Sequence, residues 1–231
     1  MTTELTAEQV LTTTRTVRRR LDLTRSVERH VVRDCLRIAF QAPNGSNLQR
    51  YRWLIVDDPA TRAAMADIYR ASLGDQLAAS ARAQAAGVPS PYPKGEAQDR
   101  ISHSVTYLAD HLHEVPVLVV PTFTGRLDRA DIFTQASAWG SVLPSVWNFM
   151  LALRTRGLGS AWTTLHLHRE QEMAALLGIP YDEVTQVGLF PVAYSLGTDF
   201  RPAVRAETET IVRWNHWDTA EVDPPRAQLP S

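Results

Sequence analysis

Residues 140–165 read GSVLPSVWNFMLALRTRGLGSAWTTL, and they decide the fold because they lead from a long apolar helix directly into a strand. The predicted helix, about Ile132 to Arg156, is apolar on most sides, so we expect it at the centre of the molecule or at a subunit contact. Gly157 tolerates the left-handed conformation that commonly ends a helix. We predict a strand over Ser160 to Leu165 directly after it.

On both sides of this stretch, the pattern of apolar residues predicts further helices and strands in alternation. Thr6 and Gln9 form a capping-box pattern for a first helix that ends near Leu21. Several predicted helices are longer than a doubly wound parallel sheet uses, so we predict an α+β fold in which helices pack on a sheet. The other predicted elements are helices over about 27–41, from about 60, over about 101–112 and over 170–177, and strands over 52–56, 115–120 and 186–194.

The length and composition predict one globular domain over residues 1–231, with 44% hydrophobic and 21% charged residues. Within it we expect a lid-like excursion at about 71–100, where prolines and glycines interrupt the helical pattern, and an extended tail at about 218–231. The formal net charge is -1, so no positive field would recruit nucleic acid or an anionic membrane. Cys35 is the single cysteine and no apolar signal segment is present, so we expect a cytoplasmic protein without an internal disulfide.

Three polar segments are candidates for chemistry, and each also has a plain structural interpretation. The basic run Arg15–Arg20 could bind a phosphate through its guanidinium groups, or could be a solvated face at a helix end. The loop Ala42–Gln49 could border a planar ligand or simply turn the chain. Gly157–Leu165 has two glycines that permit close approach of the backbone to a ring system, but it lacks the third glycine and the preceding strand of a dinucleotide-binding motif.

In this order along the chain, the segments resemble the nitroreductase family. Its members begin with an Arg-Arg-Ser-x-Arg-like element, matched by Thr14–Arg18, and continue with Ala-Pro-Ser-x-x-Asn-x-Gln before a strand, matched by Ala42–Gln49. A long helix with the pattern Gly-Ser-x-x-Pro-x-x-x-Asn is matched by Gly140–Asn148, and a Gly-Leu-Gly element follows it in both. A segment near the end of the family's chains is matched by Gly197–Arg205, so the resemblance covers about residues 13–213.

The resemblance implies a central mixed or antiparallel sheet packed by helices, a long central helix, and an interlocked homodimer. Two FMN molecules would lie at the subunit interface, held without a covalent bond and lined by both subunits. The resemblance implies that Arg15, Thr16 and Arg205 hold the phosphate and ribityl end and that Arg18 lies near the pyrimidine end. The partner subunit would border the ring system with Pro43, Asn44, Ser46 and Asn47. The backbone of Thr163, Thr164 and Leu165 would face flavin O4 and N5, and Ser141 would reach the flavin from the long helix.

Arg18 has a clear physical use under this resemblance. Two-electron reduction places negative charge around flavin N1 and O2, and a fixed cation stabilises that charge. The sequence departs from the family pattern where Thr14 replaces the first arginine of the usual pair and Asn44 replaces a serine. Arg19 or Arg20 could supply the missing charge.

The activity that the resemblance implies is electron transfer from NADH or NADPH, through flavin N5, to a small electron-poor acceptor such as a nitroaromatic compound or a quinone. The donor and the acceptor would use one pocket in turn, so no protein nucleophile and no catalytic triad are predicted. Two alternatives stay open. The chain could be a module that stores or senses FMN without turnover, or a relative that uses a deazaflavin donor or dehalogenates a specific metabolite.

Two His-x-His pairs, His111 with His113 and His166 with His168, are the remaining candidates for a metal site. A metal needs a third ligand of suitable type, and no fuller ligand motif accompanies either pair. We therefore predict no metal site. We expect these histidines at the surface or at the rim of a pocket.

Overall fold

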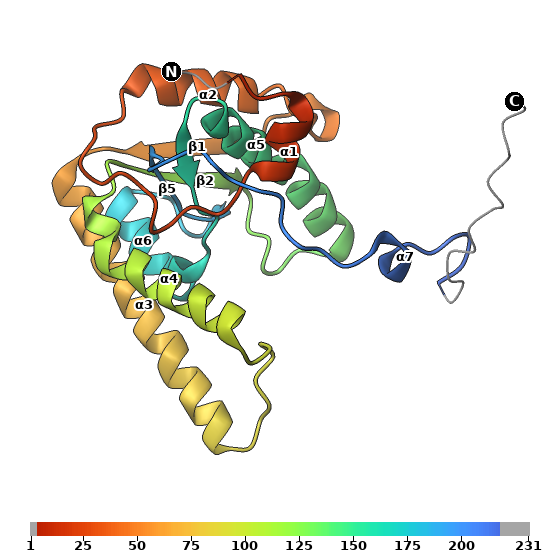
Figure 1. Cartoon of the computed structure of the whole chain (residues 1–231). Helices are drawn as coiled ribbons and strands as arrows, with labels where there is room; N and C mark the ends of the chain where they lie inside the picture. The colour runs from red at the N-terminus through yellow and green to blue at the C-terminus, as the bar shows by residue number, and fades with distance from the viewer. Residues whose placement is uncertain (1–3, 218–231) are drawn as a thin grey trace, which may run out of the picture. The chain divides into compact units, whose positions relative to one another are not determined.

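An antiparallel sheet of five strands organises the first two hundred residues (Figure 1). Every ladder in it is antiparallel, which confirms the predicted α+β class with an antiparallel sheet. The strands lie in the order β1 (Tyr51–Val56), β2 (Val117–Thr124), β5 (Phe190–Tyr194) and β3 (Leu158–Ser160), and β4 (Val184–Gln186) pairs with the last residues of β2.

The computed structural model describes residues 4–217 of the chain. The chain divides into two units, Met1–Phe200 and Arg201–Ser231, and each is described by itself. The second unit contains the short helix α7 (Thr208–Ile211), and the tail predicted at 218–231 lies outside the described residues. In the part of the chain that the structure describes, no helix is both long enough and apolar enough to cross a bilayer.

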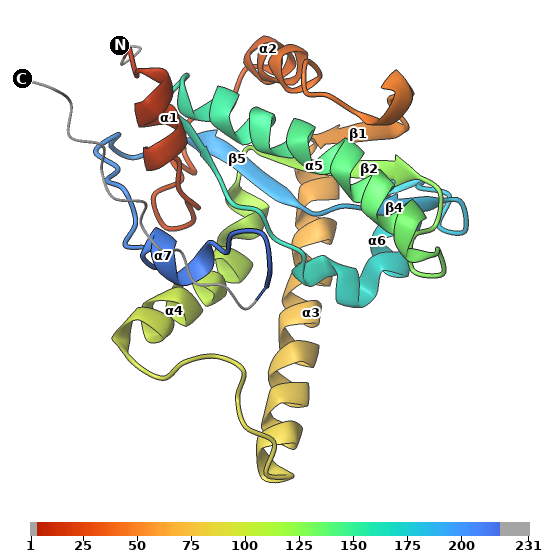
Figure 2. The same cartoon turned by 90° about the vertical axis from the view of Figure 1, so that its right-hand side faces the viewer.

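β2 is buried on both faces because its side chains alternate between two hydrophobic cores. Val117 and Val119 pack with one set of helices, whereas Leu118 and Val120 pack with the other. Figures 1 and 2 show these sets on opposite sides of the sheet. The first set is α2 (Arg29–Ala39) and α5 (Ile132–Arg154), and the second is α3 (Pro59–Ala85), α4 (Glu96–His111) and α6 (Glu170–Leu177).

Helix α5 is the long central helix that the sequence predicts. Val142, Val146 and Phe149 have no exposed surface and fill the core between this helix, α2 and the sheet. Burial of each such side chain stabilises the fold by about 1.5–3 kcal/mol. Gly157 has φ +73°, which confirms the predicted left-handed turn after the helix. Phe133, by contrast, is 78% exposed, so the first turn of α5 presents apolar surface to solvent.

The first helix is shorter than predicted. The capping box of Thr6 and Gln9 is confirmed, but α1 (Ala7–Thr13) ends eight residues before Leu21. The chain then becomes extended and runs beside β3, where Thr16 forms a bridge with Ser160. Pairing with the sheet overrides the helical pattern here, so Arg15–Arg20 do not form a helix end.

The strands predicted at 160–165 and 186–194 are also wrong in their extent. β3 ends at Ser160, and only an isolated bridge between Thr163 and Leu189 follows before the short 3-10 helix η3 (Leu165–Arg169). The second predicted strand is interrupted around Gly188, between β4 and β5. A Cβ at Gly188 would lie 3.2 Å from the carbonyl oxygen of Thr163, so the break allows a close approach of two backbone segments.

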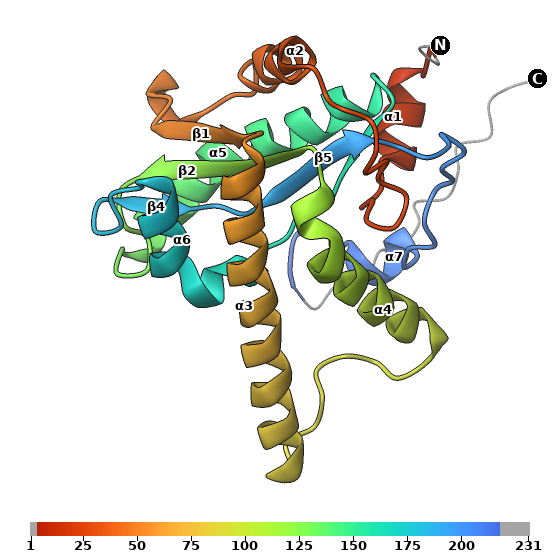
Figure 3. The same cartoon turned by 90° about the vertical axis from the view of Figure 1, so that its left-hand side faces the viewer.

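The predicted excursion at 71–100 contains the second half of α3, a loop and the start of α4. Helix α3 has no buried residue after Ser72, although it continues to Ala85. Figure 3 shows this half of α3 extending away from the sheet. Whether the segment acts as a lid stays a prediction.

Candidate functional site

The segment after α1 places its side chains alternately inside and outside the fold. Val17 is 5% exposed and belongs to the core, whereas Thr16 is exposed and Arg18 is half-buried on the other side. The guanidinium of Arg18 donates a hydrogen bond to the hydroxyl of Ser104 on α4 (3.2 Å). No carboxylate pairs with Arg18 among the residues that the structure describes, and burial lowers the pKa of Arg18. Arg18 is thus a fixed cation without an anionic partner among residues 4–217.

Tyr69 on α3 bonds to the turn that follows β3 and lies within reach of the charge of Arg18. Its side chain is 2% exposed, and its hydroxyl lies 2.7 Å from the hydroxyl of Thr163. Burial raises the pKa of Tyr69, while the hydrogen bond to Thr163 and the nearby charge of Arg18 lower it. Tyr69 is not among the site residues predicted from the sequence. The sequence does place Tyr69 four residues after Met65, on the same face of a predicted helix. This spacing indicates burial, and a buried tyrosine hydroxyl needs a hydrogen-bond partner.

The turn 163–165 offers one free backbone donor. The N–H of Thr163 already donates to the carbonyl of Leu189 (3.2 Å), and the N–H of Leu165 points at the hydroxyl of Thr163 (3.5 Å). Thr164 is exposed, and its N–H has no hydrogen-bond partner among residues 4–217. If this turn faces a flavin as predicted, Thr164 is the residue that can donate from the backbone.

The loop predicted to border the ring system is exposed and conformationally strained. It forms a short 3-10 turn, η1 (Gly45–Asn47), in which Ser46 and Asn47 both have φ +54°, a region that L residues rarely adopt. The N–H of Gly45 donates to the hydroxyl of Ser141 on α5 (2.9 Å). Asn44 accepts a hydrogen bond from the N–H of Gln49 (3.1 Å). These bonds hold the loop in shape, and they give Ser141 a structural role in positioning it.

A groove lies between this loop, the start of α5 and the residues that follow β2. Asn44, Gln49, Phe123 and Phe133 are among its lining residues. The groove combines amide groups with aromatic surface, a combination that suits a planar ligand with polar edges.

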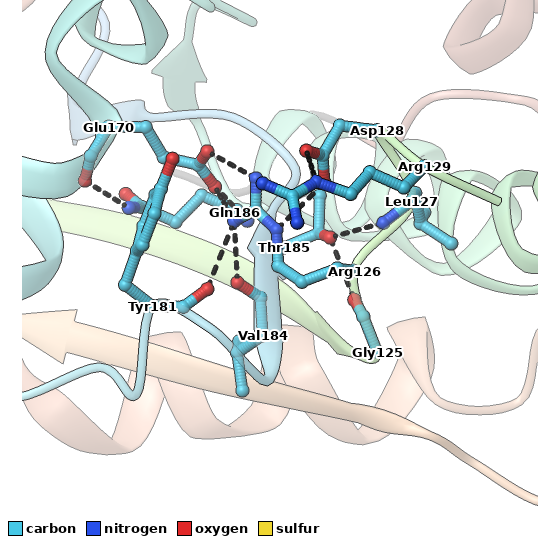
Figure 4. A network of polar contacts seen from close by, with 10 residues as sticks. All are labelled: Gly125, Arg126, Leu127, Asp128, Arg129, Glu170, Tyr181, Val184, Thr185 and Gln186. Atoms are coloured by element: carbon cyan, nitrogen blue, oxygen red, sulfur yellow. Dashed lines mark hydrogen bonds and ion pairs between the residues drawn. The ribbon is translucent and has the colours of Figure 1, made fainter.

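A network of ion pairs fixes the wall of this groove at Arg126, as Figure 4 shows. The guanidinium of Arg126 binds both carboxylate oxygens of Glu170 (3.0 and 3.0 Å) and one oxygen of Asp128 (2.9 Å). It also donates to the carbonyls of Tyr181 and Val184. Its side chain is 18% exposed and that of Glu170 is 15% exposed, so water screens the pair only weakly. The network ties the chain after β2 to α6 and β4.

The structure brings the predicted site residues into two separate groups. Thr16 and Arg18 lie beside β3 at one edge of the sheet, and the hydroxyl of Tyr69 bonds to that of Thr163. The loop at Gly45–Asn47 directly precedes β1, which is the opposite edge. One chain therefore does not bring both groups together. Arg205 is exposed and belongs to the second unit, so its predicted meeting with Arg15 stays a prediction.

Arg19 and Arg20, either of which could supply the charge missing at Thr14, both have other contacts. Arg20 pairs with Asp199 and donates to the carbonyl of Leu196 (2.8 Å). Arg19 lies over the ring of Tyr107, 5.7 Å from its centroid.

His166 corrects the expectation that the histidines lie at the surface or at a pocket rim. It is fully buried, and burial lowers its pKa to about 4. The side chains of His111 and His113 are 40% and 45% exposed. Among residues 4–217, no three His, Cys, Asp or Glu side chains are grouped so that they could hold a metal ion.

Comparison with known proteins gives one family and several similar folds. The description "Nitroreductase family" matches residues 11–194. No curated protein matches the sequence. Among solved structures, iodotyrosine deiodinase bound to FMN and 3-iodo-L-tyrosine is 23% identical with TM-score 0.64, covering 88% of this chain and 96% of that one. A BluB-like flavoprotein from Clostridium difficile 630 is 16% identical with TM-score 0.67, covering 91% and 99%. An FMN- and NADPH-dependent nitroreductase from Sphigopyxis sp. strain HMH is 17% identical with TM-score 0.64, covering 92% and 100%. At these identities, the structures show that the fold is shared.

Proposed function

We propose that this chain, which belongs to the nitroreductase family, binds FMN without a covalent bond and passes electrons from NADH or NADPH to a small electron-poor acceptor. The observation that carries the proposal is that Tyr69, whose hydroxyl bonds to Thr163 beside Thr164, also feels the charge of Arg18. Arg18 is a half-buried cation without a carboxylate partner among the described residues, and the exposed Thr164 has an N–H that none of these residues accepts. A cation and a donor held in place by the fold are suited to a planar ligand that gains negative charge.

The residues present fit this cofactor. Bound FMN supplies N5, the atom that accepts hydride from the nicotinamide donor and passes electrons to the acceptor. Arg18 would lie toward the pyrimidine end, and the N–H of Thr164 toward O4 and N5. Arg15, Thr16 and Arg205 would hold the ribityl and phosphate end. The chain itself orients the ligands, excludes water and stabilises charge.

We further propose that the working unit is a homodimer. Arg18 and the Gly45–Asn47 loop lie at opposite edges of the sheet, so a flavin lined by both needs one from each of two subunits. A two-fold axis would create two such sites at once. The apolar face of α5 supports this arrangement, because Phe133 and Trp147 are 78% and 39% exposed, as is typical of a surface that another chain covers.

The first experiment is an absorbance spectrum of the purified protein, followed by extraction and mass identification of the chromophore. We expect one FMN per subunit and a dimer by light scattering. A colourless protein that also fails to bind added FMN would refute the proposal.

The second experiment measures turnover with each donor and acceptor. NADH and NADPH are tested against a quinone, a nitroaromatic compound and an iodinated tyrosine, the last because one similar fold is a deiodinase. We expect parallel lines in double-reciprocal plots, since donor and acceptor would occupy one pocket in turn. Bound FMN that no donor reduces would instead favour a module that stores or senses flavin.

A further inference from the structure

Arg50 is a cation of the groove beside the Gly45–Asn47 loop, and two contacts hold it in place. It directly precedes β1, and its Nη2 donates to the carbonyl of Thr124 at the end of β2 (3.1 Å). The guanidinium also lies over the ring of Phe123, 5.4 Å from the centroid. Arg50 is exposed, yet these contacts fix the position of its charge at the groove.

The charge of Arg50 is not compensated inside the groove. Arg126, the other cation in the lining, is neutralised by Glu170 and Asp128. None of the described residues that line the groove is acidic, and Arg50 forms no ion pair among residues 4–217. A negatively charged group in the groove would therefore meet one guanidinium and no carboxylate of the lining.

The remaining lining suits a single aromatic ring. The groove has a volume of about 360 Å³, near the lower end of the range of roughly 300–1,000 Å³ that is typical of small-molecule sites. Phe123 and Phe133 supply aromatic surface, and Gln49 supplies a polar amide. Gln49 has φ +47°, so it shares the left-handed conformation of Ser46 and Asn47. Backbone strain kept at three residues of one loop is typical of a binding or active site.

A purely structural role explains only part of the arrangement at Arg50. A tie between the start of β1 and the end of β2 uses Nη2 alone. The N–H groups of Nε and Nη1 donate to none of the residues that the structure describes. A guanidinium held at one nitrogen can still bind a carboxylate through two parallel hydrogen bonds from its other nitrogens.

We propose that this groove binds the carboxylate of a planar aromatic acceptor, and that Arg50 selects anionic acceptors over neutral ones. The inference rests on the proposed function, including the homodimer, and names the class of acceptor. In that dimer the Gly45–Asn47 loop borders the flavin ring, and the groove has the same loop as one wall. An acceptor anchored at Arg50 by its carboxylate would thus have its ring beside the flavin.

The first test uses 4-nitrobenzoate and 4-nitrobenzamide, which have the same ring and nearly the same size but differ by one negative charge. In each, the nitro group takes up two electrons and two protons, loses one oxygen as water and becomes a nitroso group. NADH or NADPH supplies the hydride, and the solvent supplies the second proton. The measured quantity is the ratio of kcat/KM for the benzoate to that for the benzamide.

Arg50→Gln is compared with Arg52→Gln in the full-length protein with its flavin. Arg52 does not line the groove, and its side chain reaches only the carbonyl of Tyr51 (3.4 Å), so its substitution removes the same charge without changing the lining. We expect the ratio to fall about 10-fold in Arg50→Gln, the loss expected for one hydrogen-bonded ion pair, and to stay unchanged in Arg52→Gln. Turnover of the benzamide should change less than about 2-fold in either variant.

The second test measures binding without turnover. The dissociation constants of benzoate and benzamide, neither of which has a nitro group to reduce, are measured by calorimetry on the oxidised protein. That of benzoate should rise about 10-fold in Arg50→Gln and should also rise with added salt, while that of benzamide should do neither. Arg50→Lys should give an intermediate value, because an ammonium keeps the charge but not the two parallel hydrogen bonds.

Three results would overturn this inference and leave the proposed function standing. Equal loss of activity toward both acceptors in Arg50→Gln would give Arg50 a structural role only. An unchanged ratio would show that its charge does not reach the acceptor. Slower reduction of the flavin by NADPH but not by NADH in stopped-flow measurements of Arg50→Gln would assign the charge to a phosphate of the donor. If the protein binds no FMN, or reduces no acceptor, the proposed function and this inference fail together.

Discussion

Replacing Glu170 by alanine should destabilise the fold strongly, because it leaves Arg126 largely buried without its main anionic partner. Two hydrogen bonds of 3.0 Å between Arg126 and Glu170 are lost, and the N–H of Gln186 loses its acceptor (3.1 Å). Breaking a buried ion pair costs about 3–5 kcal/mol. Asp128 still pairs with Arg126, so we take the lower end, about 3 kcal/mol. In a chain of this size, that loss lowers the melting temperature by about 6–12 °C.

Differential scanning calorimetry of Glu170→Ala and Glu172→Ala tests this value. Glu172 lies on the same helix, but its side chain is 56% exposed and pairs with Arg169 at the surface, so we expect its removal to shift the melting temperature by no more than about 2 °C. The double variant Arg126→Met with Glu170→Leu should recover most of the lost stability, because no buried charge is then left unpaired and Asp128, which loses Arg126, is 48% exposed to water. Equal melting temperatures for the two single variants would refute the argument, as would a double variant no more stable than Glu170→Ala.

Three further predictions concern the site and its surroundings. Arg18→Ala should slow reduction of the bound flavin by roughly 10-fold or more in stopped-flow absorbance, with little change in melting temperature, because the half-buried cation stabilises charge rather than the fold. Tyr69→Phe should change the reduction potential of the bound flavin, but it should have no additional effect in a Thr163→Val background, because its hydroxyl acts through that of Thr163. Burial lowers the pKa of His166 to about 4 in the folded protein, whereas in the unfolded chain this histidine takes up a proton below about pH 6.5. The free energy of unfolding should therefore fall by up to roughly 3 kcal/mol as the pH drops from 6.5 to 4. Melting temperatures of the wild type and of His166→Gln over this pH range measure the effect.

Matched variants separate these effects from general damage. Arg19→Ala removes the neighbouring charge and should leave flavin reduction near the wild-type rate. Ser72→Ala removes an equally buried hydroxyl from the same helix as Tyr69, one that bonds only to the carbonyl of Ile68, and should leave the reduction potential unchanged. The role of Tyr69 would be disproved by additive effects of Tyr69→Phe and Thr163→Val. A pH dependence of stability that survives in His166→Gln would assign it to other groups.

The sequence predicts the elements whose stability comes from local or strongly periodic patterns. The capping box at Thr6, the helix over 170–177 and the left-handed turn at Gly157 agree with the structure because short-range hydrogen bonds and backbone sterics determine them. The sequence predicts a first helix that is too long, because the residues beyond Thr13 continue a helical pattern. Only their pairing with β3, about 140 residues later in the chain, makes them extended.

The site residues that the sequence analysis missed are those whose chemistry depends on contacts between distant parts of the chain. Tyr69 lies in an Ala-rich helix, and nothing near it in the sequence indicates that its hydroxyl meets Thr163. His166 belongs to a His-x-His pattern that suggests a shared strand face, but the 3-10 turn of η3 buries it alone.

Because α3 buries nothing beyond Ser72, its last turns are held mainly by their own backbone hydrogen bonds. Such a segment opens at low free energy, so its amide protons should exchange with deuterium much faster than those around Met65 on the same helix. The exposed end of α3 also offers a position for attaching a fluorescent label. A fluorophore on Leu77, which is 60% exposed, would move with the excursion and report its motion while the core of the sheet stays undisturbed.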